Sequence, residues 1–162
     1  MVKISEELKE IIRDNISYFA TSSKDGKPNV VPVGLVKAIS DTELIIVDIF
    51  FRKTRKNLEE NPQVSLAVTD MGRLKAYQLK GEAEIITQGE LFNMAFDVMR
   101  EKAEIRKKKL QQFAELAEKN RELERKLQIM RNIHERMKPK AVILMKVKEI
   151  YSTIPWEKYS EE

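Results

Sequence analysis

The sequence predicts a mainly β domain of the α+β class: a six-stranded antiparallel barrel with flanking helices and a long helical insertion before the last strand. Six segments rich in β-branched and aromatic residues follow one another, with one short helical stretch between the third and the fourth. No Gly or Pro occurs between Glu90 and Lys138, which predicts helix there. We expect residues 1–162 to form one domain, which is large enough for a proper core.

Composition narrows the possible chemistry. Cysteine is absent and His134 is the single histidine, so disulfides, thiolate chemistry and a histidine-rich metal centre are excluded, and we expect no metal site. No apolar run reaches the roughly 18 residues needed to cross a membrane, and the N-terminus lacks a signal-peptide pattern. A cytoplasmic protein without a membrane partner is expected.

The positive charge is concentrated in one segment. The net charge is +4, yet residues 100–140 carry 14 Lys or Arg against seven Glu. These charges alternate as on a solvated helix face, and Phe113 is the only aromatic residue among them, whereas a single-strand binder interleaves aromatics with basic residues. We therefore expect no nucleic-acid partner.

The first third of the chain predicts one helix and two strands. Ser5 can cap an amphipathic helix over residues 5–15. Strands follow at residues 18–22 and 29–39, joined by a tight turn at Asp25-Gly26.

The strand at residues 29–39 contains two residues that interrupt a β-ladder. Pro32 has no N–H to donate and Gly34 has no side chain to pack, so they mark an edge, a bulge or a close approach to the backbone. Two interpretations stay open: an ordinary edge strand, or a flat ligand that lies along Val31 to Val33 and uses their free backbone groups.

The next stretch predicts an anion site. Leu44 to Ile49 is apolar at almost every position, which is typical of a strand buried on both faces. Arg52, Lys53 and Thr54 follow, and then a short helix that must end before Pro62. With Thr54 as N-cap, free backbone N–H groups would point out of the positive end of the helix dipole. A phosphate monoester fits such a corner best.

A solvated turn is the competing interpretation of this basic run. Cations near a helix N-terminus are, however, unfavourable by a few tenths of a kcal/mol to roughly one. Four of them lie within residues 52–56, which favours a compensating anion.

The remaining elements complete the predicted barrel. Strands at residues 64–69 and 72–86 precede a helix that begins at Glu90, and the last strand spans residues 141–150. In the strand at residues 72–86 one face is apolar and the other is mostly polar. The tail carries the single tryptophan, Trp156.

The helical insertion covers about residues 103–136. One straight helix from Glu90 to Lys138 would be about 70 Å long and would leave the last strand far from the barrel. We therefore predict a break at Lys119-Asn120 and an antiparallel helical hairpin, because Asn accepts the left-handed conformation at helix ends. A kinked or dimer-spanning helix is the alternative. His134 is expected in the heptad-like seam of this helical segment or on its surface.

Several motifs, in this order, resemble the pyridoxamine 5′-phosphate oxidase-like, FMN-binding split-barrel superfamily. They are FATSSKDGKPNVVPV at residues 19–33, the Arg52-Lys53-Thr54-x-x-Asn57-Leu58 turn with Asn61-Pro62, and Lys80-Gly81-Glu82-Ala83. The resemblance covers Tyr18 to about Met99 and resumes from Ala141 to Tyr151. It implies a six-stranded split barrel, a homodimer, and two FMN sites at the subunit interface.

The resemblance also implies cofactor-binding residues. Lys53 and Thr54 match the family's phosphate-binding turn, and Arg52 matches the arginine before it in the oxidases. The strand whose backbone runs beside the isoalloxazine ring is matched by Val31, Pro32 and Val33. The end of the next strand, which also lines the flavin, is matched by Val47 and Asp48. Asp48 is expected to hydrogen-bond rather than to transfer protons. Gln78 lies in the strand where the oxidases place a phosphate-contacting glutamine, although at a different spacing. Trp156 either covers the partner's flavin or packs on the barrel.

Two departures from the family pattern bear on activity. Val31 stands where the true oxidases have an arginine, and the tail after Ile150 has neither Arg nor His for substrate binding. Both argue against pyridoxamine 5′-phosphate oxidation. The implied function is an FMN-dependent oxidoreductase. The alternatives are an FMN-binding electron carrier or flavin store, a deazaflavin-dependent reductase, and a structural protein that has lost the flavin.

Overall fold

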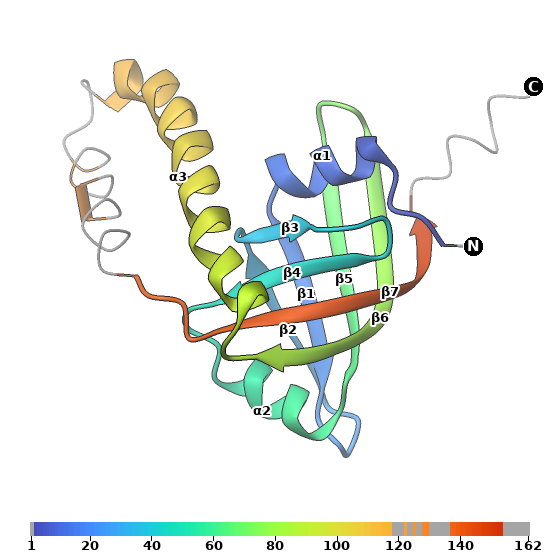
Figure 1. Cartoon of the computed structure of the whole chain (residues 1–162). Helices are drawn as coiled ribbons and strands as arrows, with labels where there is room; N and C mark the ends of the chain where they lie inside the picture. Colours follow the sequence, from blue (N-terminus) through green and yellow to red (C-terminus); the bar gives the residue numbers. More distant parts are fainter. Residues whose placement is uncertain (1, 118–121, 123–124, 126–127, 130–136, 154–162) are drawn as a thin grey trace, which may run out of the picture.

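The computed structural model describes residues 2–117, 122, 125, 128–129 and 137–153. Its elements, in chain order, are α1 (Glu6–Asp14), β1 (Ser17–Ser22), β2 (Pro28–Val33), β3 (Val36–Ala38), β4 (Glu43–Asp48), α2 (Lys53–Glu60), β5 (Gln63–Asp70), β6 (Lys75–Ile86), α3 (Glu90–Ala117) and β7 (Ala141–Ser152). The strands form one antiparallel sheet in the order β2-β1-β5-β6-β7-β4-β3, which curls into a half-barrel (Figure 1). The predicted α+β class is confirmed.

Helix α1 forms as its sequence predicts. The Ser5 hydroxyl accepts a hydrogen bond from the Leu8 N–H at 3.2 Å, which satisfies one free donor at the helix start. The apolar stripe Leu8, Ile11 and Ile12 is buried in the main core inside the curl of the sheet. Each such side chain contributes about 1.5–3 kcal/mol when it leaves water, so this face holds α1 against the sheet.

The predicted single strand at residues 29–39 is wrong, because it is two strands at opposite edges of the sheet. Strand β2 ends at Val33, the chain passes through Gly34 and Leu35, and β3 begins at Val36 on the far side of β4. The Leu35 carbonyl accepts a hydrogen bond from the Val47 N–H at 2.9 Å, which guides the chain onto β4. The described part of the chain therefore forms a half-barrel sheet of seven strands instead of the predicted six-stranded barrel. The interruption predicted at Pro32 and Gly34 is the point where the chain leaves one sheet edge for the other.

Strand β4 is buried on both faces, as predicted. Leu44 and Ile46 point into the main core, whereas Ile45 and Val47 pack beneath α3. An apolar stripe of α3 forms the other side of this second cluster, and its members are Leu91, Met94, Ala95, Val98 and Met99. The sheet is thus covered on the outside at β4 and β7 and filled on the inside (Figure 1).

Helix α3 continues to Ala117, well into the predicted insertion. It is tied to the rest of the protein by an ion pair between Lys37 and Glu101 at 2.7 Å, and by Lys102, which donates to the last carbonyls of α1. The predicted break at Lys119-Asn120, His134 and Trp156 lie outside the described residues. Among the described helices, none is long and apolar enough to span a membrane.

Strand β6 starts later than predicted, and a bulge marks its middle. Residues 71–74 form a turn with Leu74 at φ 51°, so the strand begins at Lys75 instead of Gly72. Its predicted apolar face is confirmed, since Tyr77, Leu79, Ala83 and Ile85 join the core. The register with β7 shifts between Lys80 and Gly81, where a Cβ on Gly81 would lie 2.0 Å from the Lys146 carbonyl oxygen.

Candidate functional site

Helix α2 starts soon after β4 in the chain, following a turn at residues 49–52 (Figure 1). The predicted N-cap at Thr54 is wrong: the helix begins at Lys53, and Arg52 occupies the N-cap position without a capping side-chain hydrogen bond. No acidic residue lies in the first turn. The end of α2 that carries the positive pole of the helix dipole therefore receives no compensating group from its own sequence.

Two cations at this helix start face solvent. The side chains of Arg52 and Lys53 are exposed, and neither forms an ion pair with a residue that the structure describes. Lys53 lies near the β1–β2 turn: its charge helps to lower the pKa of the Asp25 carboxyl, after the stronger effects of hydrogen bonds from Lys27 and Ser23. Arg52 and Lys53 thus place positive charge at one corner without an ion pair to a described residue, and an anion would be stabilised there.

Thr54 is buried and held from the side of β2. The Asn29 amide donates to the Thr54 hydroxyl at 3.1 Å and to the Thr21 hydroxyl at 3.2 Å. Asn57, one turn further along α2, donates to the same Thr21 hydroxyl at 3.0 Å. These four side chains fix the first two turns of α2 on the ends of β1 and β2.

Asp48 holds the corner from the side of β4. Its side chain is fully buried, and its two oxygens accept hydrogen bonds from the Phe51 N–H at 2.8 Å and from Arg55 Nε at 2.9 Å. The expectation that Asp48 makes hydrogen bonds is confirmed, and its donors belong to the protein. Sequence reasoning missed Asn29 and Arg55 as supports, because no local motif links them to their partners 25 and seven residues away.

The structure brings only some of the predicted site residues together. The start of α2 brings together Arg52, Lys53, Thr54 and Asp48. Strand β2 carries Val31 to Val33, and in the described part of the chain it pairs only with β1. The Val47 side chain instead packs beneath α3. Gln78 donates to Ser65 at 3.1 Å and lies three residues from Gly81, about 10 Å along the strand.

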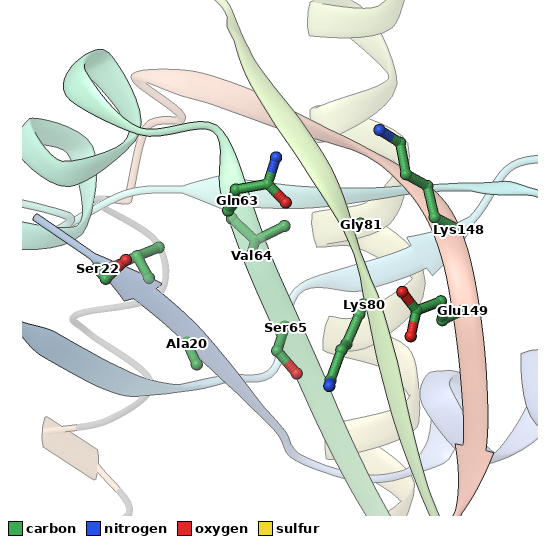
Figure 2. A pocket seen from close by; sticks show the side chains of 10 residues that line it. Ala20, Ser22, Gln63, Val64, Ser65, Lys80, Gly81, Lys148 and Glu149 are labelled. Atoms are coloured by element: carbon green, nitrogen blue, oxygen red, sulfur yellow. The ribbon is translucent and has the colours of Figure 1, made fainter. Parts of the chain in front are cut away.

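A shallow hollow of about 330 Å³ lies on the outer face of the sheet, across β1, β5, β6 and β7 (Figure 2). Ala20, Ser22, Ser65, Lys80, Lys148 and Glu149 are among its lining residues. The only sequence signal near this hollow is the Lys80-Gly81 motif, which forms the bulge between β6 and β7.

Exposed aromatic and aliphatic side chains border this hollow. Tyr18, Val30 and Tyr151 are 52%, 62% and 45% exposed, and the pairing of the strands places them on the same face. Lys80 Nζ lies 5.2 Å from the centre of the Tyr151 ring. Large exposed side chains gathered around a hollow on a sheet face are a feature of interaction surfaces.

Comparison with known proteins agrees with this architecture. The sequence model of the pyridoxamine 5′-phosphate oxidase family matches residues 4–154, which is nearly the full chain. The chain belongs to this family. Membership in the pyridoxamine 5′-phosphate oxidase-like, FMN-binding split-barrel family confirms the resemblance drawn from the Arg52-Lys53-Thr54 turn and the Lys80-Gly81 motif.

Individual relatives of this family cover much of the chain. An uncharacterized protein of Methanocaldococcus jannaschii is 37% identical over 100 residues, which span 60% of this chain and 66% of that protein. The crystal structure of HupZ from Group A Streptococcus is 25% identical, with a TM-score of 0.64 and coverage of 93% of this chain and 94% of HupZ. An FMN-binding protein from Syntrophomonas wolfei shares the fold at 12% identity and a TM-score of 0.61, over 90% of this chain and 83% of its own.

Other structures with a similar fold are named for cofactors other than FMN. An F420 reductase matches at 13% identity and a TM-score of 0.54, over 87% of this chain and 92% of its own. HutZ, a heme storage protein from Vibrio cholerae, matches at 15% identity and 0.52, over 92% and 94%. At these identities the likeness establishes the fold alone, so the cofactor must be argued from the residues of this chain.

Proposed function

We propose that the protein binds FMN at a homodimer interface and acts as an FMN-dependent oxidoreductase. The observation that carries the proposal is the positive corner at the start of α2, where Arg52 and Lys53 form no ion pair with a described residue. Arg52 and Lys53 are exposed, and no acidic residue lies in the first helical turn. A phosphate monoester placed there would meet two full positive charges and free backbone N–H groups.

The hydrogen bonds around this corner leave its residues with different roles in binding a phosphate. Arg52 and Lys53 would contact the phosphate oxygens with their side chains. Thr54 would contribute its backbone N–H, because its hydroxyl is buried and already accepts a hydrogen bond from Asn29. The free edge of β2 at Val31 to Val33 would run beside the ring system.

The charge of the corner favours FMN over its alternatives. A phosphate monoester carries close to two negative charges at neutral pH, which two exposed cations and a helix dipole balance. The phosphate of F420 is a diester with one charge, and a heme presents carboxylates in place of a phosphate monoester. A deazaflavin remains the second candidate, because it shares the ring shape.

A second copy of the chain would supply the other wall of the site. The outer sheet face presents Tyr18, Val30 and Tyr151 to solvent beside the hollow in Figure 2. Burying these side chains against the same face of a partner would remove a large apolar area from water.

FMN, when bound, supplies the electron transfer, and the protein fixes the phosphate and leaves one face of the ring accessible to a redox partner. Val31 in place of an arginine argues against pyridoxamine 5′-phosphate as the substrate. An electron carrier without a substrate of its own would use the same site.

Mass spectrometry of the small molecule released from the denatured, purified protein tests the proposal. FMN is the expected result, and release of F420, of heme or of no cofactor even after incubation with FMN would contradict it. Bleaching of the flavin absorbance by NADH or NADPH, followed by reoxidation with an electron acceptor, would separate an enzyme from a flavin store.

A further inference from the structure

We propose that Asp48 is a positioning residue, which sets the geometry of the phosphate corner through Arg55 and the Phe51 N–H without touching the ligand. The inference rests on the proposed function. Asp48 was expected to line the flavin. We assign it instead a role behind Arg52 and Lys53, where it supports their backbone.

The position of Asp48 allows it to fix the turn relative to the sheet. As the last residue of β4 it pairs with Ala141 of β7, and its carbonyl accepts from the Lys140 N–H at 2.8 Å. Its carboxylate then reaches forward to Phe51 in the turn and to Arg55 in the first helical turn. Arg52 and Lys53 lie between these two attachment points, so the sheet determines where their backbone lies.

Asp48 also neutralises one of the four cations at the start of α2. The N-cap position, Arg52, makes no side-chain bond to the helix. The carboxylate behind the helix start takes up the charge of Arg55, whose side chain is only 27% exposed. Arg52 and Lys53 are left as the cations available to a ligand. Because the Asp48 side chain is fully buried and its oxygens already accept from the Phe51 N–H and from Arg55, we do not expect a flavin to reach it.

The test compares FMN with riboflavin, which has the same ring and no phosphate. The proposed function predicts that the wild-type protein binds FMN more tightly than riboflavin in a fluorescence-quenching titration. In Asp48→Asn the FMN dissociation constant should rise about tenfold or more, while the riboflavin constant changes less than about threefold. A merely structural defect would weaken both ligands equally.

Two further variants make the result decisive. Asp70 offers a matched control, since its carboxylate accepts from the Arg73 N–H and side chain, both at 3.0 Å, at the β5–β6 turn. Asp70→Asn should leave the FMN-to-riboflavin ratio unchanged. If Asp48→Asn fails to fold, the double variant Asp48→Asn/Arg55→Gln avoids an unpaired charge and should show the same loss of FMN preference.

The outcomes distinguish the two proposals. A wild-type protein without preference for FMN over riboflavin would refute the phosphate site itself. A wild-type preference that survives in the folded Asp48 variants would overturn the positioning role alone.

Discussion

The Asn29 amide donates to the Thr54 hydroxyl at 3.1 Å and so joins the edge strand β2 to the first turn of α2. The two residues are 25 positions apart in sequence, and the same amide reaches the Thr21 hydroxyl on β1. The helix that carries the basic corner is thus attached directly to the strand that would run beside the flavin ring.

Removing this amide should loosen the attachment. Asn29→Ala leaves the buried Thr54 hydroxyl without its donor and the Thr21 hydroxyl with Asn57 alone, so the free energy of unfolding in urea should fall by about 1–3 kcal/mol. Asn93, an exposed residue of α3, provides the control, and Asn93→Ala should change stability by no more than about 0.5 kcal/mol. Equal stability of wild type and Asn29→Ala would show that the hydrogen bond does not hold the helix.

The pKa of Asp25 should report the arrival of an anion at Lys53. In the structure this pKa is lowered by hydrogen bonds from Lys27 and Ser23 and by the charge of Lys53. A bound phosphate would offset the Lys53 charge, so the Asp25 pKa should rise towards its ordinary value when FMN is added. NMR titration of the carboxyl carbon measures this.

Asp41 serves as the internal reference for that titration. Its pKa is lowered by hydrogen bonds from Lys9 and Lys3 near α1, and it should not respond to FMN. An Asp25 pKa that stays constant or falls on FMN binding would place the phosphate elsewhere.

The outer sheet face should mediate dimerisation. Tyr18→Glu would place a charge in the centre of the proposed contact, so light scattering should find a monomer and the flavin should be lost with the partner's wall. Phe96, which is 49% exposed on α3, is the matched control. If Phe96→Glu dissociates the protein and Tyr18→Glu does not, the interface lies on α3 instead.

The bulge between β6 and β7 should tolerate no side chain at Gly81. A Cβ there would lie 2.0 Å from the Lys146 carbonyl oxygen, and the backbone would have to move. Gly81→Ala should therefore cost about 3 kcal/mol of stability. Gly26→Ala is the comparison, because its φ of 80° strains an L residue while nothing lies within 4 Å, so about 1–2 kcal/mol is expected. Equal costs would refute the close approach.

Local signals in the sequence were sufficient for several elements. Ser5 before an apolar stripe predicts α1, and the unbroken apolar run of β4 predicts burial on two faces because no polar side is left for water. The Arg52-Lys53-Thr54 run likewise marks the start of α2 to within two residues. In each case the sequence signal lies in residues that are close together in the chain.

Long-range relationships could not be read in this way. Pro32 and Gly34 signal an interruption, but only the position of β4 decides that the chain crosses to the opposite sheet edge there. The Asn29–Thr54 bond and the Asp48–Arg55 pair depend on how strands meet a helix, and single polar residues in a strand carry no sign of their partner. The grouping of Tyr18, Val30 and Tyr151 on one sheet face likewise follows only from the pairing of the strands.

The most direct test of the central claim, that the start of α2 binds a flavin phosphate, is the FMN affinity of Arg52→Ala/Lys53→Ala. Lys56→Ala removes an exposed cation one turn away and serves as the control. The double variant should bind FMN about a hundredfold more weakly while its riboflavin affinity stays within about threefold of wild type, because each lost charged contact costs roughly tenfold or more. Undiminished FMN affinity in the double variant, or an equal loss in Lys56→Ala, would contradict the account.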